Sequence, residues 1–182
     1  MRETGGPSRP WVAVTLFAFA LVVLALTTLK SFFTIGLLWK PENQRVRSLE
    51  LIPLENWFTS ETWFSPVFDT LGNIAFFAPL GMLAAILLGK VRHRVLKVAG
   101  LAALFSLVIE LTQFAFSLGR TDIDDLVFNT LGGLVGAWLA GLGGKRWHTL
   151  LTVLSGLAVV VFVVLVMLGP SLGDPSKVAP TG

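Results

Sequence analysis

Five long apolar runs constrain the fold of this chain more than any other feature of its sequence. None of them contains Asp, Lys or Arg, and they cover residues 11–29, 71–89, 98–118, 126–142 and 149–169. At about 1.5 Å per helical residue, such runs approach the roughly 30 Å thickness of a hydrocarbon core. The fourth run is the shortest, so we expect its helix to begin earlier, around Asp124 and Asp125, which suit a first helical turn. The sequence therefore predicts an all-α, polytopic transmembrane helix bundle of about five spans.

The composition agrees with a membrane protein and argues against a water-soluble domain. Of the 182 residues, 54% are hydrophobic and 14% are charged, whereas soluble domains carry about 25% charged residues. We expect one transmembrane domain over 11–169, a cytoplasmic N-terminus over 1–10 and a disordered tail over 170–182. The net charge is only +3, and no basic patch interleaved with aromatics suggests a nucleic-acid partner. The expected partner is the lipid bilayer.

The basic residues of the short loops predict the orientation in the membrane. The loop 90–97 and the loop around Lys145 and Arg146 are basic and free of acids, which is typical of cytoplasmic loops. Arg2 and Arg9 then place the N-terminus inside, at the cell membrane of a multi-pass protein. The loop 30–70, the turn 119–124 and the C-terminal tail fall outside. The loop 30–70 is rich in Trp and Phe, so we expect an extracytoplasmic, aromatic-rich cap at headgroup level.

Glu110 is the most informative single residue, because an ionisable side chain inside a membrane span is costly and is a functional candidate by default. Small and polar residues form one stripe on its predicted helix, spaced by three and four, and that stripe must face protein. The stripe comprises Ala99, Ala103, Ser106, Glu110, Gln113 and Ser117. The fourth span carries a matching stripe of Asp125, Asn129, Gly132, Gly136 and Ala140. Its GxxxG spacing predicts close contact with the Glu110 helix.

The alternating topology brings these polar residues to one end of the bundle. The second span starts outside, the third ends outside and the fourth starts outside, so their polar residues converge in the outer half. The candidate ligand-binding residues are Asn73, Glu110, Gln113, Arg120, Asp122, Asp125 and Asn129. The same cluster also fits a purely structural lock of hydrogen bonds and ion pairs between helices. A path for ions or protons is a third alternative, weakened by the lack of acids in the inner half.

Four segments resemble the VanZ-like family of bacterial membrane proteins, in order and at similar spacing. They are LIPLENW (51–57), GNIAFFAPLG (72–81), IELTQ (109–113) and GRTDIDDLVFNTLGGLVG (119–136). The resemblance covers a core over 51–136 and implies a cell-envelope protein of a family named for a member associated with resistance to the glycopeptide teicoplanin. It implies no defined activity and does not transfer resistance itself. The motif positions that it carries over are Asn73, Phe77, Pro79, Gly81, Glu110, Gln113, Arg120, Asp122, Asp125, Asn129 and Gly132.

The chemistry available at the outer end is limited. The chain has no Cys and no Tyr, and both His residues fall in expected cytoplasmic loops, which disfavours zinc sites and Ser-His-Asp catalysis outside. We expect no cofactor and no metal, because three acids beside Arg120 are more typical of a solvated, capped turn. The first hypothesis is a lipid-linked or cell-wall-related ligand in an outward-facing polar pocket, with Arg120 contacting an anionic group. The alternatives are a membrane enzyme using Glu110 or Asp125 as acid or base, and a structural lock.

Overall fold

The computed structural model describes residues 5–28 and 47–168, apart from the side chains of Arg47, Ser48 and Arg120. The expected tail 170–182 lies outside the described residues. The structure confirms the all-α class, since the only strands in the described part are two short ones. In chain order the elements are α1 (Arg9–Thr28), β1 (Arg47–Glu50), α2 (Glu55–Thr59), α3 (Phe64–Leu88), α4 (Arg94–Phe116), β2 (Gly119–Asp122), α5 (Ile123–Leu139) and α6 (Lys145–Leu168).

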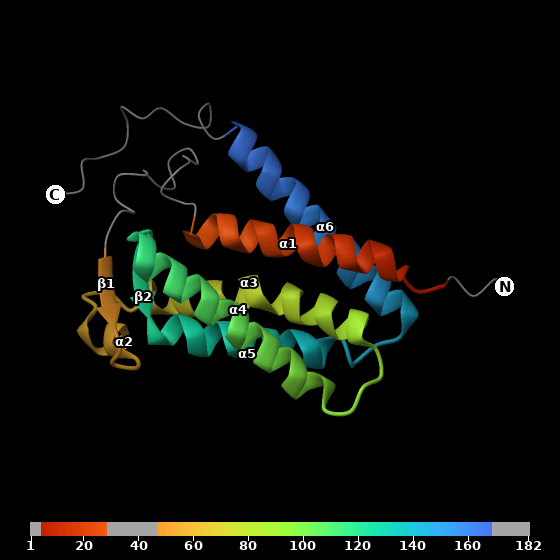
Figure 1. Ribbon diagram of the computed structural model, residues 1–182, viewed down its shortest axis with the longest axis horizontal. Coiled ribbons are helices and arrows are strands. Elements are labelled where there is room, and N and C mark those ends of the chain that lie inside the picture. Colours follow the sequence, from red (N-terminus) through yellow and green to blue (C-terminus); the bar gives the residue numbers. More distant parts are fainter. Residues whose placement is uncertain (1–4, 29–46, 169–182) are drawn as a thin grey trace.

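Four of the described helices, α1, α3, α4 and α6, are long and apolar enough to cross a membrane. They contain 20, 25, 23 and 24 residues. The fifth long helix, α5, has 17 residues and is therefore about 25 Å long. It runs beside α3 and α4 for most of their length (Figure 1). The expected count of about five spans thus corresponds to four full-length helices and one shorter helix packed among them.

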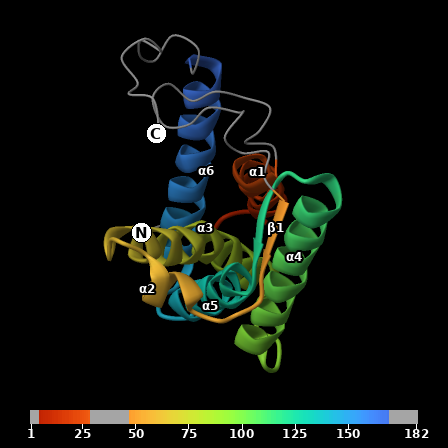
Figure 2. The same cartoon turned by 90° about the vertical axis from the view of Figure 1, so that its left-hand side faces the viewer.

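The helices alternate in direction, which gives the bundle two chemically different ends (Figure 1). We call the polar end the one where α1 and α4 finish and α3 and α5 begin, together with α2, β1 and β2. The basic end is the opposite one, where α3 and α5 finish and α4 and α6 begin. Helix α6 tilts away from the other helices (Figure 2), and its buried residues, Leu151, Thr152 and Ser155, all lie in its first half.

Glycines on α5 set the closest helix contact, and here the structure corrects a sequence-based prediction. Gly132 and Gly136 face α3, not α4: a Cβ added at Gly132 would lie 2.7 Å from the carbonyl oxygen of Ile74, and one at Gly136 would overlap the backbone of Ala78. Gly81 of α3 meets the backbone of Gly133 in the same crossing. The spacing predicted the tight face correctly. It assigned that face to the wrong neighbour, because periodicity identifies a face on its own helix and not the helix that packs against it.

The predicted contact between α4 and α5 exists, but other residues make it. A Cβ added at Gly133 would overlap that of Ala102 on α4. One turn toward the polar end, the side-chain amide of Asn129 donates to Ser106 Oγ across 2.9 Å. The polar stripe of α4 therefore faces α5 at Ser106, whereas Gln113 of the same stripe bonds to α1.

A two-stranded parallel ladder closes the polar end. Strand β1 pairs with β2 in the register Arg47–Gly119 to Glu50–Asp122. The pairing ties the middle of the expected 30–70 loop to the turn between α4 and α5 (Figure 2). Backbone groups in β1 and β2 gain hydrogen-bond partners that an open loop would leave unpaired at the edge of a membrane.

Candidate functional site

A polar cavity of about 380 Å³ lies at the polar end, in the size range of ligand sites. Its lining combines residues of α1, α2, α3, α4 and α5. Four of the seven site candidates from the sequence line it, namely Asn73, Gln113, Asp122 and Asp125. Further polar lining residues are Thr27, Asn56, Ser65, Asp69, Thr70 and Asp124, with Trp57, Phe76 and Phe128 as aromatic walls.

Gln113 is the most unusual polar residue in this lining. Its side chain is 4% exposed, and Nε2 donates to the backbone oxygen of Thr27 on α1 across 3.1 Å. Its Oε1 is buried and has no hydrogen-bond partner among the residues that the structure describes. A buried polar atom without a partner costs about 1–3 kcal/mol. Gln113 therefore presents an unused acceptor beside a cavity that has room for a donor.

Helix α2 covers one side of the cavity and is held by acids of the α5 start. The backbone N–H of Leu54 donates to both carboxylate oxygens of Asp124, at 3.0 and 2.9 Å. Asp122 caps α5 by accepting from the Asp124 N–H at 2.8 Å. The Asn56 amide approaches Asp122 Oδ2 at 3.4 Å. These contacts make the cover of the cavity part of the same hydrogen-bonded unit as its floor.

The α3 side of the cavity is joined to α5 by Asn73. Its side-chain amide donates to Oδ1 of Asp125. Both residues are partly buried and line the cavity. Glu110 and Asp125 are the two candidate acids of an enzyme, and of these Asp125 lines the cavity. The Asn73 amide orients its carboxylate.

Glu110 and Asn129 lie behind the cavity, not in its lining. Glu110 is 5% exposed, and its Oε2 accepts from the backbone N–H of Asp122 at 3.0 Å. The Thr121 hydroxyl also donates to the Glu110 carbonyl oxygen at 3.3 Å. Asn129, 3% exposed, bridges to Ser106 on α4. Both residues hold α4 against the turn and start of α5.

Arg120, the remaining sequence candidate, contributes its backbone to β2 opposite Ser48. Its side chain lies outside the described part of the structure. The expected contact between Arg120 and an anionic group therefore stays a prediction.

Sequence reasoning missed several lining residues, above all Asn56 and Asp69. Asn56 belongs to the LIPLENW segment on which the family resemblance rests, so that segment could have indicated it. Its position in a predicted loop did not show which residues it would contact. Asp69 was expected in the outer loop, but α3 begins at Phe64, seven residues before the expected start. The longer helix brings Asp69 and Asn73, spaced by four, to one face.

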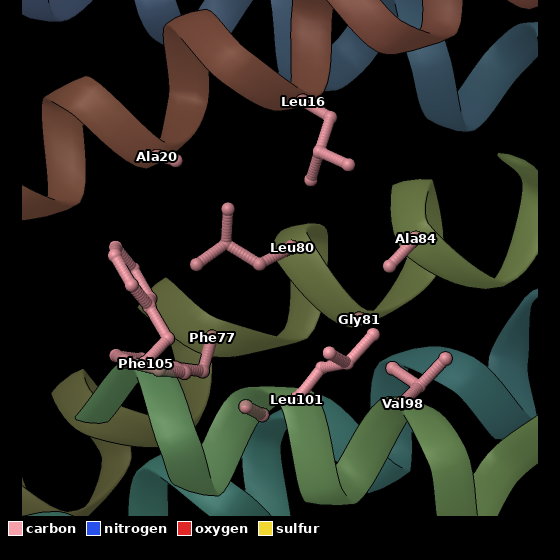
Figure 3. Close-up of a pocket in the computed structure, with 10 residues that line it drawn as sticks. Leu16, Ala20, Phe77, Leu80, Gly81, Ala84, Val98, Leu101 and Phe105 are labelled. Carbon is pink, nitrogen blue, oxygen red and sulfur yellow. The ribbon is translucent and has the colours of Figure 1, made fainter. Parts of the chain in front are cut away.

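A second, apolar cavity of about 180 Å³ lies deeper in the bundle, between α1, α3 and α4. Figure 3 shows Leu16 and Ala20 of α1 above Leu80 of α3, with Phe105 and Leu101 of α4 across from them. An apolar cavity of about 150 Å³ holds a molecule the size of benzene. The volume and the apolar lining of this cavity are those of a space for a small hydrocarbon group.

The two cavities follow the same helix faces. On α4, Ala102 of the apolar cavity and Gln113 of the polar cavity are eleven residues, or three turns, apart. On α1, Leu16 and Thr27 have the same spacing. The hydrogen bond between Gln113 and Thr27 therefore lies three turns from the apolar cavity, toward the polar end, where both residues line the polar cavity.

The described residues contain no group of three or more His, Asp or Glu side chains arranged to hold a metal ion. The polar cavity instead offers carboxylate and amide oxygens, which accept hydrogen bonds, with aromatic surfaces beside them. Such a lining suits ligands rich in hydroxyl, amide or amine donors.

Comparison with known proteins agrees with the motifs. Protein VanZ of Enterococcus faecium is 34% identical over 106 residues, which are 58% of this chain and 60% of that protein. The chain thus covers about 60% of the length of this curated relative. No solved structure matches the chain significantly. The family model for VanZ/LLP1 matches residues 16–144, including α3, α4, α5 and the polar cavity, and the chain therefore belongs to the VanZ/LLP1 family of membrane proteins.

Proposed function

We propose that this protein binds a lipid-linked, cell-wall-related molecule, with the polar head in the polar cavity and part of the lipid chain in the apolar cavity. The observation that carries the proposal is that Oε1 of buried Gln113, at the cavity lining, has no partner in the described part of the chain. A ligand hydroxyl or amide donor at this atom would remove the cost of leaving it unpaired.

The cavities in line along α1 and α4 support the lipid-linked character of the ligand. A head held by Gln113, Asn73 and Asp125 would leave its chain directed toward the space between Leu16 and Phe105. The apolar lining of that space matches hydrocarbon and no polar group. The aromatic residue Trp57, beside the polar cavity, adds a flat surface on which sugar rings stack.

We place the polar end on the outer side of the cell membrane and the N-terminus in the cytoplasm. Support comes from the connections at the basic end, which carry Lys90, Arg92, Arg94, Lys145 and Arg146 and no acid. The cavity then opens toward the side where cell-wall precursors are used.

A structural lock is the second candidate function, because several polar side chains each bridge two elements. Glu110 joins α4 to β2, Asn129 joins α5 to α4, and Gln113 joins α4 to α1. Under this alternative the residues stabilise the bundle and select no ligand. Its distinguishing property is that no probe stabilises the protein.

The test uses the full chain in detergent and a polyprenyl pyrophosphate carrying a disaccharide pentapeptide as the probe. We expect the probe to raise the melting temperature, since a ligand that binds only the folded state stabilises it. Gln113→Met should weaken probe binding by about tenfold, the value of one lost hydrogen bond of roughly 1.4 kcal/mol. Polyprenyl phosphate without the sugar should bind equally to the parent and the variant.

Asn129→Leu is the matched control, because it also removes a buried amide that bridges two helices but lies off the cavity. It should lower the melting temperature and leave probe affinity unchanged. If the parent protein is not stabilised by the probe, or if both variants lose affinity equally, the lock replaces the binding function.

A further inference from the structure

A third cavity, of about 630 Å³, lies at the basic end, across the bundle from the polar cavity. It is bounded by the connection between α3 and α4 and by the connection between α5 and α6. Its polar lining is Lys90, His93, Arg94 and His148, and its apolar lining includes Ile86 and Leu96. We infer that this cavity is a separate binding site for the phosphate headgroup of an anionic membrane phospholipid.

The described residues that line this cavity include two cations and no acid. The sequence contains no Asp or Glu from residue 70 to 109 or from 126 to 173. The ends of α3 and α5 and the starts of α4 and α6, which meet here, therefore carry cations and no carboxylate. An anion entering the cavity meets the positive charges of Lys90 and Arg94 at close range.

Contacts with both walls of the cavity hold the Arg94 side chain in place. Its side chain is partly buried, and NH1 approaches the Gly89 carbonyl oxygen at 3.5 Å. Its NH2 lies 3.0 Å from where a Cβ would stand on Gly141, on the opposite wall. The guanidinium thus spans the gap between the two connections. Its planar fork matches the oxygens of a phosphate.

His148 fixes the other wall. Its Nε2 lies 2.9 Å from the carbonyl oxygen of Ala140, and Trp147 next to it donates to the carbonyl oxygen of Leu139 at 2.9 Å. These two contacts tie the start of α6 to the end of α5. The cavity therefore keeps its width through side chains that bridge the turn between these helices.

The apolar part of the lining favours a phospholipid over a soluble phosphate. Ile86 and Val95 belong to spans, so the cavity lies where membrane-crossing helices end and lipid headgroups begin. A phospholipid can place its phosphate at Arg94 and its glycerol and upper chain against these residues. Free phosphate would use the cations alone.

The test measures binding of phosphatidylglycerol to the full chain by native mass spectrometry from detergent, with phosphatidylcholine as the neutral reference lipid. A double variant, Lys90→Gln with Arg94→Gln, removes two cations that line the cavity. The matched control, Lys97→Gln with Arg146→Gln, removes two exposed cations at the same end that do not line it. The two variants have the same net charge.

We expect phosphatidylglycerol to bind the parent in preference to phosphatidylcholine. The lining variant should lose about 25-fold in affinity, at roughly fivefold for each basic residue near a lipid headgroup. The control variant should lose less than about threefold. Lys90→Gln alone, at an exposed position, gives an intermediate loss and keeps the test valid if the Arg94 variant does not fold.

Three outcomes would overturn the inference. Equal losses in the two double variants would indicate a diffuse positive surface without a site. Displacement of phosphatidylglycerol by millimolar inorganic phosphate or glycerol phosphate would identify a soluble phosphate ligand. Equal affinities for phosphatidylglycerol and phosphatidylcholine would show that the negative charge of the lipid headgroup does not contribute to binding. None of these results depends on the polar cavity, so they are distinct from failure of the proposed function.

Discussion

The backbone N–H of Asp122 donates a hydrogen bond to the carboxylate of Glu110, with 3.0 Å between the nitrogen and Oε2. This contact assigns the buried acid of α4 a definite task, which is to hold β2 and the start of α5 against the end of α4. Because Glu110 does not line the polar cavity, we expect its hydrogen bond to affect stability and its negative charge to have no effect on ligand binding.

Glu110→Gln should fold and bind the lipid-linked probe like the parent, because the amide oxygen can still accept from Asp122. Glu110→Leu should lower the free energy of unfolding by about 1–3 kcal/mol, since the buried Asp122 N–H loses its acceptor. Thermal unfolding of both variants in detergent, followed by probe binding, measures the difference. A stable Gln variant without probe binding would place Glu110 in the binding site instead.

Gly136→Ala should destabilise the protein by about 1–3 kcal/mol, because the added methyl group meets the backbone of Ala78 on α3. Gly156→Ala on α6 is the control, as its Cβ would meet nothing within 4 Å. That substitution should be neutral or slightly stabilising, because Ala favours the helix. Denaturant unfolding of the two variants checks the α3–α5 contact, which would be wrong if they behaved alike.

Asp124→Ala should loosen the cover of the polar cavity without unfolding the bundle. Both carboxylate oxygens of Asp124 accept from the Leu54 N–H. Leu54 has a φ of 62°, a backbone conformation that is costly for a residue with a side chain. Chymotrypsin should cut the variant faster at Trp57 and Phe58. Leu54→Gly should keep the parental cleavage rate, because glycine adopts this backbone conformation freely. Unchanged cleavage of Asp124→Ala would show that other contacts hold α2.

The proposed orientation can be measured with single cysteines, because the chain has none of its own. Ser60→Cys lies at an exposed position of the polar end, and Arg92→Cys at an exposed position of the basic end. In intact cells, a membrane-impermeant maleimide should label residue 60 and spare residue 92, with both labelled after permeabilisation. The reverse pattern would move the polar cavity to the cytoplasmic side.

The amino-acid sequence was sufficient to predict the class of the protein, its approximate helices and the residues that meet at one end. Apolar length gives the spans, and strict alternation of direction brings Asn73, Gln113 and Asp125 to one level without any knowledge of packing. Family motifs covered the same positions. These conclusions depend on local properties and on the order of the helices, so a single sequence suffices for them.

The packing of the helices was needed to show which polar residues face the cavity and which are enclosed behind it. Gln113 and Glu110 are three residues apart on one stripe, yet one lines the cavity and the other binds the Asp122 backbone. Likewise, Gly132 and Gly136 pack on α3, although the stripe of small and polar residues on α4 has the spacing that matches theirs. Helical periodicity defines a face of one helix. The helix that packs against that face depends on crossing angles and on contacts between distant parts of the chain, such as the pairing of β1 with β2.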